Sequence, residues 1–147
     1  RALRLCLEAL QKEYIVAIAP EGTRSGNGRL QRGLPGVVML AMQSRAPLMP
    51  LVFYGNERFK ENISSLKRTD FNIVLGHAFR LRESSAKTSH EERRVITDEI
   101  MYQMAALLPP QYRGAYADLS LASDAHLVFE PPAKSNIVIN HTLLTPN

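Results

Sequence analysis

The chain has 147 residues, of which 45% are hydrophobic and 22% charged, and its net charge is +4 at pH 7. This length fits one domain, and the composition excludes a disordered or fibrous protein. The apolar runs fall far short of the roughly 20 residues that cross a bilayer, so we expect no spanning helix. A single cysteine, Cys6, excludes an internal disulfide and a cysteine-based zinc site. The chain begins at Arg1 without a leader, which predicts a piece of a longer protein.

The positive charge is concentrated in the first third of the chain. Residues 1–46 carry the whole basic excess, and the remaining residues contain equal numbers of acidic and basic side chains. The excess centres on Arg24, Arg29 and Arg32, with no acidic residue among them. One interpretation is an anionic ligand for this segment. The alternative is a solvated loop whose arginines only keep the protein soluble.

The first predicted elements are a short helix and a buried strand. Leu3, Leu7 and Leu10 recur at helical spacing, which predicts an amphipathic helix over 2–12. Residues 14–19 form a short apolar run with β-branched side chains, ended by a proline. Such a run is typical of a strand that is covered on both faces.

A glycine-rich loop and a second helix follow. Residues 20–36 contain five of the eight glycines, a density that favours an irregular loop. Val38 and Met42 resume helical spacing within 35–45, and Pro47 marks the end of this helix. The loop therefore joins the predicted strand to the start of a helix.

The rest of the chain alternates between strands and helices. Residues 48–54 and 71–76 are predicted strands, joined by a charged connection over 56–70 that has room for a short helix. Ser89 and Glu92 form a Ser-x-x-Glu capping box, which predicts the start of a long helix that ends at two prolines. The order of elements predicts an α/β fold, with a mixed sheet and flanking helices.

One short segment carries the chemical information, because it follows the predicted strand directly and so lies where α/β folds place ligands. Gly22 allows backbone N–H groups to approach an anion, and Thr23 and Ser25 offer hydroxyls. Arg24 can grip two phosphate oxygens in a bidentate fork. Glu21 would repel a phosphate, so it is expected either to orient Arg24 or to accept a hydrogen bond from a substrate hydroxyl.

This segment resembles the PlsC-like glycerolipid acyltransferases of the lysophosphatidic acid acyltransferase type. Residues 20–25 reproduce the last six residues of the family's Phe-Pro-Glu-Gly-Thr-Arg-Ser block, with Ala19 in the place of the phenylalanine. Residues 47–51 are similar to its Pro-Ile-Val-Pro-Val block. The resemblance covers residues 1–82 and implies the C-terminal part of a glycerol-phosphate acyltransferase domain over 1–116. Residues 117–147 are expected to form an extension or tail, which could include an edge strand.

The resemblance implies a reaction, a site and a location. A fatty acyl group would move from an acyl-CoA or acyl carrier protein thioester to a hydroxyl of a glycerol phosphate or lysophospholipid, as in phospholipid biosynthesis, with no cofactor consumed. Glu21, Gly22, Thr23, Arg24 and Ser25 would bind the acceptor phosphate. A protein of this kind would act as a 1-acyl-glycerol-3-phosphate O-acyltransferase on a membrane surface, at the cytoplasmic face.

The family's catalytic base, a His-x4-Asp pair, is missing from this chain. None of the histidines is followed five residues later by an aspartate; they are His77, His90, His126 and His141. In the family this pair precedes the Glu-Gly-Thr-Arg block, so we expect it before Arg1. We therefore assign no catalytic residue and no metal ligand here, and we expect the chain alone to be inactive.

A different class of function is the alternative. The basic glycine-rich loop over 20–36 could serve a non-catalytic module that binds phosphate or a nucleotide. The chain lacks a Gly-x4-Gly-Lys-Ser/Thr pattern, and its basic residues are not interleaved with aromatic ones. We therefore expect no nucleic-acid partner and favour the enzyme.

Overall fold

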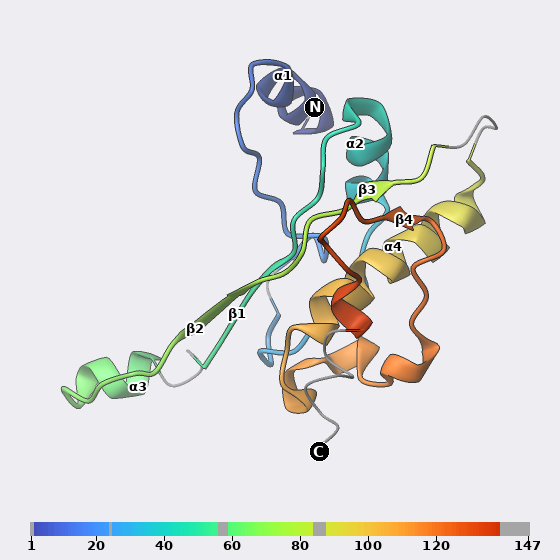
Figure 1. Cartoon of the computed structure of the whole chain (residues 1–147). Helices are drawn as coiled ribbons and strands as arrows, with labels where there is room; N and C mark the ends of the chain where they lie inside the picture. Colours follow the sequence, from blue (N-terminus) through green and yellow to red (C-terminus); the bar gives the residue numbers. More distant parts are fainter. Residues whose placement is uncertain (1, 24, 56–58, 84–87, 139–147) are drawn as a thin grey trace.

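The structure is a computed structural model, and it describes residues 2–23, 25–55, 59–83 and 88–138 (Figure 1). Helices and short strands alternate along the chain, which confirms the predicted α/β class. In chain order the elements are α1 (Ala2–Gln11), α2 (Gly36–Ser44), β1 (Leu51–Tyr54), α3 (Phe59–Ser64), β2 (Asn72–Leu75), β3 (Arg80–Leu81), α4 (His90–Ala106), the 3-10 helices η1 (Pro110–Tyr112), η2 (Gly114–Tyr116) and η3 (Leu119–Leu121), and β4 (Leu127–Val128).

Within the described residues, the strands form two antiparallel pairs in place of the mixed sheet that we expected. β1 pairs with β2, and β3 pairs with β4. The β1–β2 hairpin reaches away from the rest of the molecule and carries α3 beyond its far end (Figure 1). Val52 is buried, whereas Leu51 and Phe53 on the opposite face of β1 are exposed. These strands are therefore covered on one face only.

The predicted strand over 14–19 does not form. This segment follows α1 and makes no strand pairing with the described residues. Ile15 is 99% exposed, although its β-branched side chain favours a strand. The prediction was wrong because a strand needs a neighbouring strand to bond its backbone, and α1 leads into this segment with no buried residue of its own.

The core lies between α2, the short strands and α4. In one cluster, Val38 of α2 packs with Phe79, Ile100 and Leu127. Met42, which we placed on the same apolar side of α2, is 36% exposed. The predicted helices over 2–12, 35–45 and 89–108 are confirmed, as is the short helix in the connection after β1.

α4 is the central element, and α2, η2 and η3 pack against it. Its capping box is formed as predicted: Glu92 N donates to Ser89 Oγ at 3.0 Å, and Ser89 N donates to the Glu92 side chain at 3.4 Å. The C-terminal segment runs back along the helix through η1, η2, η3 and β4 (Figure 1). There the buried Gln103 side chain accepts a hydrogen bond from Asn136 N at 2.8 Å.

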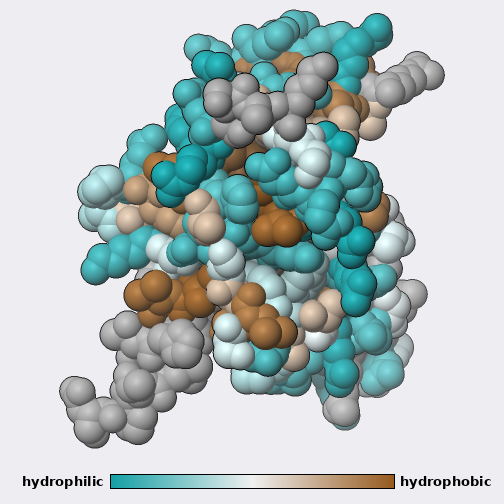
Figure 2. Space-filling model, turned by 90° about the vertical axis from the view of Figure 1, so that its right-hand side faces the viewer, coloured by the Kyte–Doolittle hydropathy of each residue, from teal (hydrophilic) through white to brown (hydrophobic). Residues whose placement is uncertain are grey.

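The surface on one side of the molecule is largely hydrophilic, and its hydrophobic side chains are divided among several separate patches (Figure 2). None of the helices in the described part of the chain is long and apolar enough to cross a membrane.

Candidate functional site

The loop that follows residue 19 is closed at its base by two hydrogen bonds. Leu34 N donates to Pro20 O at 2.7 Å, and Gln31 N donates to Glu21 Oε2 at 2.7 Å. Pro20 is buried, and Glu21 is half-buried. The carboxylate of Glu21 therefore joins the outgoing and returning arms of the loop, a structural role that our sequence-based hypotheses did not include.

Gly22 makes the first turn of the loop. Its φ of +68° lies in the left-handed region that favours glycine, and a Cβ there would lie 2.5 Å from Leu34 Cδ1. Its N–H donates to Ala19 O at 3.0 Å. In this conformation Gly22 shapes the turn and uses its own N–H within it.

The predicted hydroxyl groups lie at the outer end of the loop. Thr23 is exposed, and Ser25 is half-buried. The Ser25 hydroxyl donates to Asn27 Oδ1 at 2.9 Å and accepts from Arg29 N at 3.0 Å. Arg24 lies outside the described residues. The structure thus brings Glu21, Gly22, Thr23 and Ser25 into one loop with a fixed base.

The returning arm of the loop is anchored to the turns after α4. Leu30 N donates to Tyr112 O, and Ala115 N donates to Leu30 O, both at 3.0 Å. Gly114 permits this approach, because a Cβ at its position would lie 2.0 Å from Leu30 O. Leu30 is itself buried in the core cluster of Met101. The loop is therefore fixed by backbone bonds to a rigid part of the fold.

Gly33 places the end of the loop directly on α4. A Cβ at Gly33 would lie 2.7 Å from both Thr97 and Met101, so only glycine allows this contact. Gly33 N donates to the Tyr116 hydroxyl at 3.1 Å, and that hydroxyl donates to Asp98 Oδ1 at 2.8 Å. One tyrosine therefore links the loop, α4 and η2.

A cavity of about 280 Å³ opens between this end of the loop and α4. It is lined by side chains and backbone of Arg32, Gly33, Arg94, Thr97, Asp98, Tyr102, Ala115 and Tyr116. Burial raises the pKa of Tyr116 to about 12, and burial together with the charge of Asp98 raises the pKa of Tyr102. Both phenols therefore keep their protons at neutral pH and can act as hydrogen-bond donors.

The charge pattern of the sequence pointed to Arg32 in the basic segment but not to Arg94. Arg94 lies on the polar side of a well-predicted helix, where an arginine usually has no role beyond solubility. Only the folded chain brings Arg32 of the loop and Arg94 of α4 to one cavity. No sequence pattern links these two positions.

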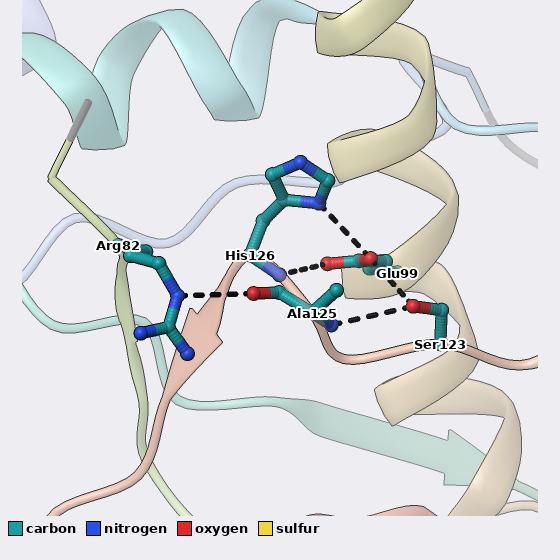
Figure 3. Close-up of polar contacts among 5 residues, drawn as sticks. All are labelled: Arg82, Glu99, Ser123, Ala125 and His126. Carbon is teal, nitrogen blue, oxygen red and sulfur yellow. Dashed lines mark hydrogen bonds and ion pairs between the residues drawn. The ribbon is translucent and has the colours of Figure 1, made fainter. Parts of the chain in front are cut away.

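A second polar cluster lies elsewhere on α4, around Glu99 (Figure 3). The Glu99 side chain is only 3% exposed, and it accepts hydrogen bonds from Ser123 Oγ at 2.8 Å and His126 N at 3.0 Å. His126 Nδ1 lies 3.1 Å from Glu99 Oε1. Arg82 donates two further hydrogen bonds to this segment. Its Nε donates to Ala125 O at 3.0 Å, and its backbone N–H donates to His126 O at 2.7 Å.

This Glu99 cluster holds the C-terminal segment and does not have the geometry of a nucleophile and its base. Ser123 donates to Glu99, so its hydroxyl is not activated by His126. His126 does have a carboxylate partner, which the His-x4-Asp spacing could not reveal because Glu99 precedes it by 27 residues. In the described ranges, no three side chains of the His, Cys, Asp and Glu types lie together as a metal would need.

A larger, more open hollow of about 410 Å³ lies where the β1–β2 hairpin meets η1. Tyr54, Arg68, Asp70 and Tyr112 are among the residues that line it. The guanidinium of Arg68 already has an ion pair, because its Nε lies 3.7 Å from Asp70 Oδ1. This hollow is therefore a weaker candidate for an anion-binding site than the cavity beside the loop.

Comparison with known proteins finds a similarity in the part of the chain that contains the loop. Residues 1–54 match the family model described as Acyltransferase. A 1-acyl-sn-glycerol-3-phosphate acyltransferase of Limnanthes alba is 44% identical over 45 residues, which are 31% of this chain and 16% of that relative. No solved structure matches the chain. The expected resemblance to PlsC-like acyltransferases is confirmed for residues 1–54.

Proposed function

We propose that the chain is the C-terminal part of a 1-acyl-glycerol-3-phosphate O-acyltransferase. The enzyme would move a fatty acyl group from an acyl-CoA or acyl carrier protein thioester to a hydroxyl of a glycerol phosphate or lysophospholipid. The observation that carries this proposal is the family match over residues 1–54, which include the whole block from Glu21 to Ser25. The name of the Limnanthes alba relative supports the choice of acceptor.

The loop from Pro20 to Leu34 would bind the acceptor phosphate. Thr23 and Ser25 would supply hydroxyl groups, and Arg24 would supply a bidentate cation. The bond from Gln31 N to Glu21 and the turn at Gly22 would keep the loop in one shape, so that little conformational entropy is lost on binding. In this division of roles Glu21 acts on the loop and not on the reacting groups.

The chemical step would need a base that this chain does not supply. The acceptor oxygen forms an ester bond with the acyl carbon, the carbon–sulfur bond breaks, and the thiol leaves with a proton. The acceptor hydroxyl gives up its own proton to a base, for which we propose a His-x4-Asp pair in a preceding segment of the full-length protein. General-base catalysis typically contributes a factor of about 100 to 10,000 in rate.

The enzyme would work at a membrane surface on the cytoplasmic face. Its acceptor and product carry acyl chains that partition into bilayers. Attachment would come from a preceding segment or from an apolar patch near α1, where Leu5 is 54% exposed. Flotation of the full-length protein with anionic liposomes checks this, and recovery only in the soluble fraction would contradict it.

The test of the proposed activity uses labelled acyl-CoA and lysophosphatidic acid. We expect the full-length protein to form phosphatidic acid and the 147-residue chain to form none. Turnover by the chain that is abolished by Glu21→Gln would assign the base to Glu21 and contradict our division of roles. Phosphate binding by the full-length protein without any turnover would favour the non-catalytic alternative.

A further inference from the structure

We propose that the cavity between the loop and α4 binds a phosphomonoester, held by the guanidinium groups of Arg32 and Arg94. This inference rests on the proposed function only for the origin of the ligand. The site itself is argued from the cavity and its charges. Arg94 lies beyond the residues that match the acyltransferase family model, so the match does not assign the site.

The charges of the cavity favour an anion. Arg32 and Arg94 are both exposed, and among the described residues neither forms an ion pair. Most of the other exposed arginines in the described ranges have an ion-pair partner, as Arg80 has in Glu130 at 3.2 Å. The one carboxylate in the lining is Asp98, and its Oδ1 already accepts the Tyr116 hydroxyl. Two cations thus face one cavity with a single, already engaged anion.

The two arginines are mounted on fixed backbone. Arg32 precedes Gly33, whose N–H is bound to Tyr116 and whose Cα packs against Thr97 and Met101. Arg94 lies in α4, one turn before Asp98. A site that is already organised in this way loses little entropy when it binds a ligand. Two guanidinium groups also match the oxygens of a phosphomonoester dianion better than one does.

The remaining lining groups define the rest of the ligand. The free oxygen of Asp98 can accept a hydrogen bond from a hydroxyl next to the phosphate, and the Tyr102 hydroxyl can donate one. A cavity of about 280 Å³ has room for a phosphate with a small polyol attached. The ligand class is therefore a phosphomonoester with a neighbouring hydroxyl. The ribose 3′-phosphate of coenzyme A and the head group of the acceptor both have this chemistry.

The experiment measures binding to the 147-residue chain by calorimetry and by amide chemical shifts. The probes are adenosine 3′,5′-bisphosphate, for the donor, and glycerol 3-phosphate, for the acceptor. We expect Arg32→Gln and Arg94→Gln to weaken binding of the same probe, each by about tenfold or more. The loss of a charge-assisted hydrogen bond implies an effect of this size. Arg94→Lys should weaken it less.

The matched control is Arg68→Gln, which removes the same charge at a position that lies outside the loop and does not line the cavity. Equal weakening by Arg68→Gln and Arg94→Gln would show diffuse attraction and overturn the proposal, as would binding that neither cavity variant changes or no binding at millimolar concentrations. If the two cavity variants lose binding of adenosine 3′,5′-bisphosphate, the site belongs to the donor. If they lose binding of glycerol 3-phosphate, the site belongs to the acceptor.

Failure of the proposed function gives a different result from failure of this site. A full-length protein that transfers no acyl group, with probe binding that still depends on Arg32 and Arg94, keeps the site and removes the enzyme. Acyl transfer that continues while neither probe depends on these arginines keeps the enzyme and removes the site.

Discussion

The two polar clusters to which α4 contributes differ in whether their charged groups already have partners. Glu99 is buried, and its two oxygens are engaged by Ser123 and His126. Beside the loop, Arg32 and Arg94 face a cavity without an ion-pair partner in the described residues. A saturated buried carboxylate stabilises the fold, whereas cations that the fold leaves open are available to a ligand. Mutations in the two clusters should therefore affect different properties.

The largest effect on stability is expected from Glu99→Ala. This change removes the shared acceptor of Ser123 Oγ and His126 N, and buried donors without partners are costly. We expect the free energy of unfolding to fall by about 3 kcal/mol in urea denaturation. Glu99→Gln, which keeps one acceptor oxygen, should cost less. If the free energy of unfolding falls by no more than it does for a typical surface substitution, the cluster does not hold the C-terminal segment.

Tyr116→Phe should have the next largest effect, because it removes one hydroxyl that serves two partners. Gly33 N would lose its acceptor and Asp98 its donor. The expected loss is about 1 to 2 kcal/mol in the free energy of unfolding. The variant also tests whether the effect is local to the loop. Hydrogen exchange of the Gly33 amide should accelerate more than exchange of the amides in β1. Equal acceleration at both places would argue for a global effect.

The raised pKa of Tyr116 predicts how the free energy of unfolding depends on pH in the alkaline range. Its pKa is raised by burial from 10.0 to about 12 in the folded protein, so the folded state holds its proton more tightly than the unfolded state does. This contribution is fully present below pH 10 and is lost as the pH rises towards 12. Tyr116→Phe should flatten that part of the stability curve. An unchanged slope in the variant would contradict the assignment.

The smallest effect on stability is expected in the open cavity. Arg32→Gln and Arg94→Gln remove exposed groups that form no ion pair with the described residues, so each should change the free energy of unfolding by less than about 0.5 kcal/mol. Combined with weakened probe binding, this result would separate a ligand site from a structural cluster. A loss above about 1 kcal/mol would place the arginines with the structural groups.

Local sequence signals predicted the local structure well. The capping box at Ser89 and Glu92 correctly placed the start of α4, and the density of glycines correctly placed the irregular loop. The apolar run over 14–19 led to a wrong strand prediction. Strand pairing depends on a neighbouring strand, often distant in the chain, and strand propensity alone does not supply one.

The candidate site was only partly predictable for the same reason. The block from Glu21 to Ser25 is contiguous, so its composition and its resemblance to a family could be read directly. The hydrogen bond from Gln31 N to Glu21 also joins residues that are close in sequence, but no sequence motif predicts it. Arg94 and Tyr116 come to the loop from distant parts of the chain, and only the packing of Gly33 on α4 brings them together.

We propose that the loop after residue 19 binds the acceptor phosphate of an acyltransferase. The most direct test compares Arg24→Ala with Arg68→Ala in the full-length protein, because both changes remove one basic side chain and Arg68 lies outside the loop. We expect Arg24→Ala to raise the KM for lysophosphatidic acid by about tenfold or more and to leave the KM for acyl-CoA unchanged, and we expect Arg68→Ala to change neither. An unchanged acceptor KM in Arg24→Ala, with the fold intact, would contradict it.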